Sequence, residues 1–368
     1  MRGRTIGMAA AAIGALLVGA PAAGNAATGW QRQDLPNVDS EHMLTDTAAL
    51  GANDVWAIGP TYGGDPTVLL HWDGTSWTRN AGPGQDDFAG SSISGVSGSD
   101  VWAAGHCTFA PQTSETPCAT HWNGSAWSTP VRLPPPDIGT TVTVDAVAAH
   151  DVWVAGGQTN SAYYAHFDGA TWSRVAAPAG AGEYITDLAA TGPKDVWAAG
   201  YRVGNSGDAA DRPVVQHWDG TRWTRFTTPD VAGRLSQIAP IDGTRVWAVG
   251  NGTGHTLVLR RSGTGFYQAP AVPGTDTFAT GVAPDGTGGA WIALTPAFPD
   301  GAGSAQTSTT HYAHFANGAW TLANGGTYSG QIRSWTLTRV PGTTSSLYAV
   351  GTDDTDAGPV GYVESSTG

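Results

Sequence analysis

The chain has 368 residues, of which 52 are Gly, 23 are Pro and 16 are Trp, and only 13% are charged. This abundance of Gly and Pro excludes an architecture of long helices, whereas a hydrophobic content of 40% is enough for a sizeable core. The formal net charge is −13, so the sequence lacks the concentrated positive charge with which proteins bind nucleic acid or an anionic membrane surface.

Residues 1–26 have the layout of a secretory signal peptide. Two arginines precede an apolar run from Ile6 to about Val18, and small residues around Ala26 offer a cleavage site. A transmembrane anchor is the alternative, but the run contains glycines and is shorter than the roughly 20 apolar residues that a span requires. We therefore expect a secreted, extracellular protein without membrane insertion after cleavage, in which residues 27–368 form one domain.

A six-residue pattern recurs along the rest of the chain. It reads Asp-Val-Trp-Ala-Ile-Gly at 54–59, returns with small changes at 100–105, 151–156 and 195–200, and has weaker copies at 246–250, 290–293 and 347–351. The aromatic residues of successive copies are 46, 51, 44, 50, 44 and 57 residues apart. Units of this length are typical of propeller blades or solenoid repeats.

Each unit contains four candidate strands. A short apolar segment precedes the pattern, and a His-Trp or His-Phe segment follows it, ending in most copies at an Asp-Gly or Asn-Gly hairpin turn before a further Trp. Four antiparallel strands per unit indicate a propeller blade. The expected blades cover residues 44–81, 91–131, 142–176, 184–227, 235–269, 277–322 and 331–365.

The two ends of the chain point to a closed ring. The seventh unit stops soon after Gly361-Tyr362-Val363 without a fourth strand, and residues 27–36 resemble the fourth-strand segment 73–79. We therefore predict an all-β fold, a closed seven-bladed β-propeller of four-stranded antiparallel blades whose last blade is completed by the N-terminal strand. A linear solenoid would not explain the missing strand.

The turn motif resembles the Asp-box of BNR-type propellers, in which an Asp and a Gly followed by an aromatic residue close a hairpin between outer strands. The Val-Trp-Ala-x-Gly strand is similar to kelch and BNR-like repeats of secreted bacterial proteins. This resemblance implies the fold and no single function, because such rings host sialidases, oxidases, lyases, lectins and scaffolds.

Cys107 and Cys118 are the only cysteines, and export to an oxidising compartment predicts a disulfide between them. The repeated histidines belong to different blades, so we expect local hydrogen bonds and no shared metal site; they are His71, His121, His166, His217 and His314. The repeated Trp side chains are expected to fill the wedges between blades.

The innermost strands should line a central channel. By sequence matching, their equivalent positions are Thr45-Asp46, Ser94-Gly95, Val144-Asp145, Thr186-Asp187, Ser236-Gln237, Thr280-Gly281 and Ser334-Trp335. Asp46, Asp145 and Asp187 would meet near a channel mouth and hold a calcium ion or a polar ligand through their oxygens, with Gln237 and Trp335 as further binding candidates. Alternatively, each Asp bonds the backbone of a neighbouring strand and the channel holds only water. No other cofactor is predicted.

In a propeller, the loops from second to third strands and the links between blades emerge on one face. These segments vary most in this chain, and variable loops on a rigid scaffold commonly carry binding sites. The candidate stacking residues on that face are Tyr62, Phe109, Tyr184, Tyr201 and Tyr328, and their candidate polar partners are Arg202, Arg212 and Arg234.

The leading hypothesis is a secreted, non-catalytic, lectin-like protein that recognises glycans or another cell-surface polymer through this face. One alternative is a glycan-degrading hydrolase or lyase that uses carboxylates at the channel mouth. Asp46, Asp145 and Asp187 would provide enough carboxylates for this chemistry, although the sequence does not fix the distances between them. The other alternative is an extracellular protein-interaction scaffold. The expected partner is thus a glycan or a protein.

Overall fold

The computed structural model describes residues 29–38, 41–62, 67–83, 88–110, 114–135, 142–158, 161–180, 182–204, 210–274, 277–296 and 307–367. The predicted signal peptide at 1–26 lies outside these residues. In the described part of the chain every regular element is a β-strand, and no helix there is long and apolar enough to cross a membrane.

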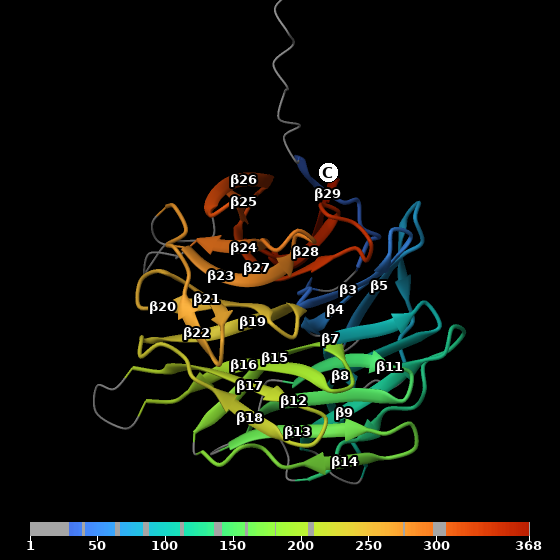
Figure 1. Ribbon diagram of the computed structural model, residues 1–368. Coiled ribbons are helices and arrows are strands. Elements are labelled where there is room, and N and C mark those ends of the chain that lie inside the picture. The colour runs from blue at the N-terminus through green and yellow to red at the C-terminus, as the bar shows by residue number, and fades with distance from the viewer. Residues whose placement is uncertain are drawn as a thin grey trace, which may run out of the picture.

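Seven antiparallel sheets follow one another along the chain and form a seven-bladed β-propeller, which confirms the predicted fold. In Figure 1 the colour runs around the ring from blue through green and yellow to red, so the first and last blades are neighbours. Each blade is a meander of four strands, the first innermost and the fourth outermost, and only blade 1 has its inner strand in two pieces.

Blades 1 to 4 contain strands β2 to β18. Blade 1 holds β2 (Glu41–His42), β3 (Asp46–Gly51), β4 (Asp54–Tyr62), β5 (Thr67–Trp72) and β6 (Trp77–Asn80). Blade 2 holds β7 (Phe88–Ser97), β8 (Asp100–Thr108), β9 (Glu115–Trp122) and β10 (Val131–Arg132). Blade 3 holds β11 (Val142–Ala148), β12 (Asp151–Gln158), β13 (Ser161–Phe167) and β14 (Trp172–Val175). Blade 4 holds β15 (Glu183–Gly192), β16 (Asp195–Arg202), β17 (Arg212–Trp218) and β18 (Trp223–Phe226).

Blades 5 to 7 contain the remaining strands. Blade 5 holds β19 (Gly233–Asp242), β20 (Arg245–Gly252), β21 (Thr256–Ser262) and β22 (Gly265–Gln268). Blade 6 holds β23 (Thr277–Pro284), β24 (Ala290–Pro296), β25 (Ser308–Ala316) and β26 (Ala319–Tyr328). Blade 7 holds β27 (Gln331–Arg339), β28 (Leu347–Thr355), β29 (Gly358–Thr367) and, as its outermost strand, β1 (Gly29–Arg32).

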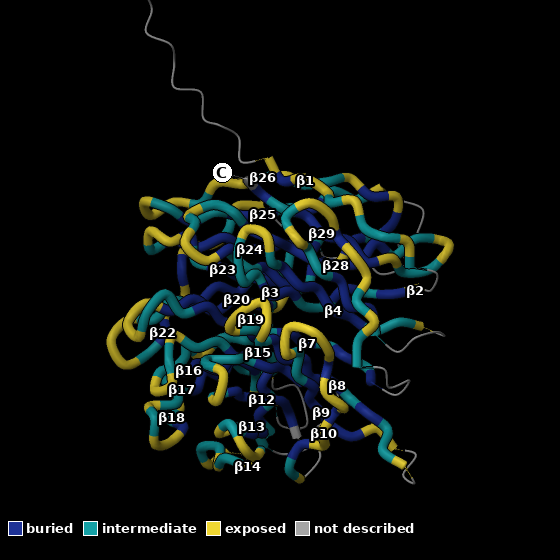
Figure 2. Tube along the Cα trace, turned by 90° about the vertical axis from the view of Figure 1, so that its right-hand side faces the viewer, coloured by how far each residue is buried: buried dark blue, intermediate teal, exposed yellow. Residues whose placement is uncertain are grey.

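The ring closes through β1. This strand runs antiparallel to β29, with Trp30 opposite Ser366 and Arg32 opposite Glu364. Figure 2 shows β1 beside β29, with the buried strands gathered in the interior of the ring. The predicted completion of the last blade by the N-terminal strand is therefore confirmed.

Because successive strands alternate in direction, the ring has two different faces. The face called here the short-turn face carries the turns from first to second and from third to fourth strands. The opposite face, called here the variable-loop face, carries the loops from second to third strands and the links between blades. The hairpins on the short-turn face explain the repeated Asp-Gly pairs: Gly74 has a φ of +95°, and the Asp73 carboxylate accepts backbone N–H groups from Thr75 and Ser76 at 2.8 and 2.9 Å.

The repeated tryptophans join each blade to the next. Trp153 of blade 3, for example, lies edge-on to Trp223 of blade 4 with ring centroids 5.4 Å apart. Trp291 of blade 6 meets Trp30 on the closing strand at 6.1 Å, and Tyr348 of blade 7 meets Trp77 of blade 1 at the same separation. All six aromatic side chains are buried, as wedge filling predicts, and the same kind of aromatic contact joins blade 7 to blade 1 where the ring closes.

The histidines of the third strands have local partners. His71 Nε2 lies 2.9 Å from Asp54 Oδ1, which also accepts the Trp56 indole N–H at 3.1 Å, and the His71 ring stacks on Trp56 at 4.3 Å. The same Asp–His–Trp arrangement recurs in blades 2, 3 and 4. These Asp residues thus bond side chains, whereas turn residues such as Asp73 bond backbone. In blade 5, where the motif is missing, Arg260 takes the place of the histidine above Trp247, 4.5 Å from the ring centre.

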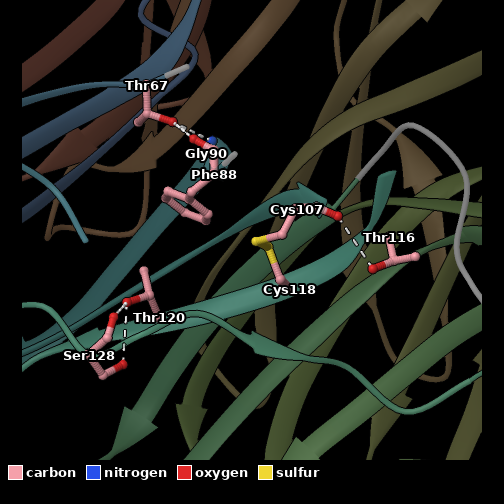
Figure 3. Close-up of a disulfide and its surroundings, with 8 residues drawn as sticks. All are labelled: Thr67, Phe88, Gly90, Cys107, Thr116, Cys118, Thr120 and Ser128. Atoms are coloured by element: carbon pink, nitrogen blue, oxygen red, sulfur yellow. Dashed lines mark hydrogen bonds between the residues drawn. A yellow bond between two sulfur atoms is a disulfide. The ribbon is translucent and has the colours of Figure 1, made fainter. Parts of the chain in front are cut away.

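The predicted disulfide links the second and third strands of blade 2. Cys107 lies on β8 and Cys118 on β9, their Cα atoms are 5.9 Å apart, and both side chains are buried in the core between blades 1 and 2. In Figure 3 the disulfide lies close to Phe88, and the Thr116 hydroxyl donates to the Cys107 carbonyl at 3.4 Å. The disulfide therefore closes the loop between β8 and β9 on the variable-loop face.

Candidate functional site

The centre of the ring contains a cavity of about 290 Å³, lined by residues from the inner strand of every blade. Asp46, Asp145, Asp187 and Gln237 all contribute to its wall. The lining continues along the inner strands to residues beside the first-to-second turns, including Arg339. The cavity therefore extends from the level of these carboxylates toward the short-turn face, away from the variable loops.

Each channel aspartate bonds the inner strand of an adjacent blade. Asp46 Oδ2 accepts the Ile93 backbone N–H at 2.9 Å and the Ser92 hydroxyl at 2.8 Å. Asp187 Oδ2 accepts the Ile238 N–H at 2.8 Å, and Asp145 accepts the Ser94 hydroxyl of the preceding blade at 3.0 Å. Asp46 and Asp187 thus bond the backbone of the following blade, as in the alternative interpretation, whereas Asp145 bonds a side chain of the preceding blade.

Gln237 makes the corresponding link from blade 5. Its side-chain carbonyl accepts the Val282 backbone N–H of blade 6, and its amide donates to Thr336 Oγ1 of blade 7 at 2.7 Å. Blade 6 has Gly281 at the equivalent position, where an added Cβ would lie 2.7 Å from the Leu337 backbone nitrogen. The glycine lets blades 6 and 7 approach closely, so Gln237 can reach past blade 6.

The carboxylates in this cavity have raised pKa values. Burial raises the pKa of Asp46 to about 6, against the lowering effect of its hydrogen bonds. Burial likewise raises the pKa of Asp145 to about 7, with a further contribution from the negative charges of Asp46 and Asp151. For Asp187, burial and then the charges of Asp46 and Asp145 raise the pKa well above its usual range. The three carboxylates therefore interact, and each keeps partial contact with the channel space.

The calcium hypothesis requires several oxygen ligands converging on one point. Within the described residues, no group of three or more His, Cys, Asp or Glu side chains is arranged to hold a metal ion. The carboxylates are directed to backbone N–H groups and hydroxyls of adjacent blades, which accounts for their positions without a cation.

The backbone register corrects the matching of inner-strand positions. Asp46, Asp187 and Gln237 occupy one register position, opposite Ile58, Ala199 and Val249. At this position blade 2 carries Ser92, blade 3 carries Thr143 and blade 7 carries Thr336. Asp145 lies opposite Trp153, two residues farther along the same face of its strand, and hence nearer the short-turn face than Asp46.

Trp335 has a different environment from the one predicted. It is the unpaired residue of a β-bulge, because Ser334 pairs with Gly351 and the next pair is Thr336 with Val350. Its indole N–H donates to Thr352 Oγ1 on β28 at 3.0 Å, and Trp335 is absent from the residues lining the channel cavity. The same bulge occurs at Thr186, Ser236 and Thr280, so Trp335 is equivalent to these residues and lies one residue before the position of Asp187.

Several predicted loop residues do come together on the variable-loop face. Tyr184 and Tyr201 pair across β15 and β16, and their rings stack with centroids 5.3 Å apart and an interplanar angle of 11°. The Arg234 guanidinium of blade 5 lies over the Tyr201 ring at 4.4 Å and forms an ion pair with Asp211. On its other side Tyr184 lies against Gly157 of blade 3, where an added Cβ would be 2.0 Å from the ring.

The segment beside this stack is held by further polar contacts. Asp211 accepts the Gly204 backbone N–H at 3.0 Å, and Arg212 Nε pairs with Asp230 at 2.8 Å. The Arg234 side chain is 58% exposed, whereas the two rings are half-buried. We call Tyr184, Tyr201, Asp211, Arg212 and Arg234 the Tyr–Arg cluster. Arg202 is exposed next to it, opposite Glu183 on β15.

The other aromatic candidates are scattered. Tyr62 is 52% exposed at the end of β4, with its hydroxyl 3.4 Å from Met43 Sδ. Phe109 is partly buried and packs against the core between blades 1 and 2. Neither residue is part of the Tyr–Arg cluster.

Tyr328 is not an exposed stacking residue, contrary to the prediction. Only 2% of it is exposed, and its hydroxyl donates to Glu364 Oε1 at 2.7 Å. Glu364 is fully buried on β29 and also accepts the hydroxyls of Tyr312 and Thr310 at 2.8 and 2.9 Å. Strand β26 extends to Tyr328, beyond the predicted blade end at 322, and this extension carries Tyr328 into the interface between blades 6 and 7.

Sequence reasoning missed a second cavity on the variable-loop face. It has a volume of about 820 Å³ and lies where the link from blade 7 enters blade 1. Its walls include Arg32, Leu35, Val38, Glu41 and Val360. No sequence motif marks it, because it forms between two segments that only the closure of the ring brings together.

No family model and no curated protein match this chain. Solved structures of similar fold include YCF48 bound to D1 peptide, with a TM-score of 0.58 at 13% identity over 92% of this chain and 97% of that chain. U3-55K has a TM-score of 0.59 at 10% identity, covering 92% of this chain and 99% of the other. A GH74 xyloglucanase from Xanthomonas campestris has a TM-score of 0.57 at 12% identity, covering 88% of this chain and 53% of its own length. These likenesses support the propeller fold, and the BNR or kelch relationship rests on the repeat motifs alone.

Proposed function

We propose that the protein is a secreted, non-catalytic binding protein that recognises glycans through its variable-loop face. The observation that carries this proposal is the Tyr–Arg cluster, in which candidate residues from blades 4 and 5 form one ordered, partly exposed surface. Its residues lie on strand ends and loop anchors of a rigid ring, the usual place for binding residues.

The chemistry of the cluster suits a polyhydroxylated ligand. Tyr hydroxyls, guanidinium N–H groups and carboxylate oxygens supply both donors and acceptors, and the edges of the stacked rings supply apolar contact. Stacking and ion pairing also fix the side chains before a ligand arrives, which lowers the entropy lost on binding. The fold is compatible with polymer ligands, since similar propellers include a peptide complex and a xyloglucanase.

A glycan array followed by calorimetry tests the proposal. The wild-type chain should bind a subset of glycans, and Tyr201→Ala and Arg234→Ala should each weaken binding of those glycans about tenfold or more. The matched control is Tyr267→Ala, because Tyr267 is 41% exposed on β22 and lies outside the cluster. Equal binding by all three variants, or the absence of any glycan ligand, would refute the proposal.

A second candidate function is favoured by the channel carboxylates. Carboxyl groups with pKa values of about 6 and 7 in a shared cavity can act as acids or bases near neutral pH, which is the requirement of glycan hydrolysis. This hypothesis predicts turnover of a glycan that is lost in Asp46→Asn and in Asp187→Asn. Unchanged turnover in both variants, or none in the wild type, would count against it.

A further inference from the structure

The cavity of about 820 Å³ at the junction of blades 7 and 1 is independent of both sites described above. One wall is the link that follows β1, from Gln33 to Val38, together with β2. The opposite wall is the start of β29, at Pro359, Val360 and Gly361, with the turn that precedes it. The cavity is therefore a gap that opens where the N-terminal segment leaves β29.

The register of β29 shows which part of its outer edge has no strand partner. β1 pairs with β29 only from Glu364 to Thr367, and the last contact is the Gln33 N–H donated to the Val363 carbonyl at 2.9 Å. β28 pairs with the other edge of β29 from Gly358 onward. Among the described strands, none pairs with the outer edge of β29 over the five residues from Gly358 to Tyr362.

This unpaired stretch is longer than in comparable blades. In blade 4, β18 pairs with β17 from Val215 to Trp218, which leaves three residues of β17 without a strand partner on that edge. In blade 6, β26 pairs along the whole of β25. Among the described strands, the stretch of β29 from Gly358 to Tyr362 that lacks a strand partner on its outer edge is therefore longer than the corresponding stretch of β17 in blade 4.

Backbone geometry directs hydrogen-bonding groups into the gap. In an antiparallel pair the N–H and C=O of one residue point to the same edge, and the edge alternates from residue to residue. Because the Val363 carbonyl faces β1, the N–H and C=O of Gly361 face the same way, toward the cavity that Gly361 lines. Pro359 contributes only its carbonyl on this edge.

The walls of the gap are apolar at the base and charged at the rim. Leu35 and Val38 are partly buried and pack against the core shared by blades 7 and 1, so their positions are fixed. Val360 is 41% exposed on the strand itself. Arg32, Asp34 and Glu41 are exposed at the rim.

We propose that this gap binds an extended peptide segment of another protein, which adds as a strand to the outer edge of β29. The peptide continues the line of β1 antiparallel to β29, exchanges backbone hydrogen bonds with Gly361, and places alternate apolar side chains against Leu35 and Val38. An extended peptide fits because recognition by a free strand edge is a backbone interaction, with specificity from the pockets beside it. Five residues of strand span about 17 Å.

The proposal goes beyond glycan recognition and uses different residues. The probe is a phage-displayed library of random heptapeptides, selected on the full chain, and the recovered peptides are then measured on Val360→Lys. Lysine on a strand edge opposes the addition of a further strand. The matched control is Val131→Lys, since Val131 is 45% exposed on the outer strand of blade 2.

Peptides recovered by selection should bind the wild-type chain and Val131→Lys equally, and Val360→Lys at least about tenfold more weakly. Each recovered peptide is also made in two N-methylated copies, one methylated at its odd residues and the other at its even residues. Methylation removes the N–H groups that a strand partner needs, so one of the two copies should lose binding. Tyr201→Ala should leave peptide binding unchanged, so failure of glycan recognition and failure of this proposal are separable. No enrichment of peptides, equal binding by the two lysine variants, or full binding of both N-methylated copies would overturn the proposal.

Discussion

The substitution Asp145→Asn is expected to stabilise the protein at alkaline pH. The pKa of Asp145 rises from 3.8 in the unfolded chain to about 7 in the folded ring, mainly because burial disfavours its charge. The folded state therefore binds more protons than the unfolded state, and stability falls as pH rises from about 4 through 7. At 1.36 kcal/mol per pKa unit, a shift of about three units costs the wild type up to about 4 kcal/mol at pH 8.

Urea denaturation at pH 4 and pH 8 measures this effect. Asn keeps a side-chain carbonyl that can accept the Ser94 hydroxyl, and it carries no charge. Asp145→Asn should therefore unfold at a higher urea concentration than the wild type at pH 8, and at about the same urea concentration as the wild type at pH 4. The control is Asp34→Asn, the same charge change at an exposed residue, which should follow the wild type. If wild-type stability is flat across this range, or if Asp145→Asn has the slope of the wild type, the reasoning about the buried carboxylates is wrong.

Three further substitutions test the packing of the ring. Trp30→Ala removes a buried ring stacked on Tyr312 at 3.6 Å and should cost about 3 to 5 kcal/mol in urea unfolding; a loss below about 1 kcal/mol would contradict the closing role of Trp30. Glu364→Gln places amide N–H groups where hydroxyl donors converge and should cost about 1 to 3 kcal/mol, so an unchanged unfolding midpoint would refute that network. Replacing both Cys107 and Cys118 by Ala should lower stability by up to about 3 kcal/mol and the thermal midpoint with it, whereas an unchanged midpoint would show that the disulfide contributes nothing.

The closing strand was predictable because it repeats a pattern present elsewhere in the chain. The Trp after each hairpin turn recurs, so Trp30 was identifiable as a fourth-strand residue without a blade of its own. The wedge-filling role of the Trp residues followed from the same repetition, since equivalent positions in a ring have equivalent neighbours.

The inner-strand register was not predictable, because a bulge inserts one residue without altering the apolar pattern. Blades 4 to 7 bulge one residue before the position of Asp187, at Thr186, Ser236, Thr280 and Trp335, whereas blade 3 pairs continuously from Thr143 to Asp145. Matching by sequence therefore placed Asp145 level with Asp46 when it lies two residues nearer the short-turn face. Tyr328 was misplaced for a related reason, since no turn signal indicates how far β26 extends.

Contacts between side chains of different blades were also not predictable from the sequence. Tyr184 and Tyr201 are neighbours across one hairpin, but Arg234 reaches Tyr201 from the next blade, and this depends on the angle between blades. The cavity beside Val360 depends in the same way on the path of the link from β1 to β2. These features arise from three-dimensional placement that the repeat pattern does not specify.

Closure of the ring by β1 is the central claim, because it fixes both the variable-loop face and the gap beside β29. The direct test is the double variant Gln31→Cys with Ser365→Cys, since these residues pair across β1 and β29 at a separation suited to a disulfide. Mass spectrometry of the oxidised monomer should find the two new cysteines joined, and a control that combines Gln31→Cys with Ser173→Cys on β14 should not cross-link. Free thiols at residues 31 and 365 under oxidising conditions, or cross-links only between molecules, would contradict the closed ring.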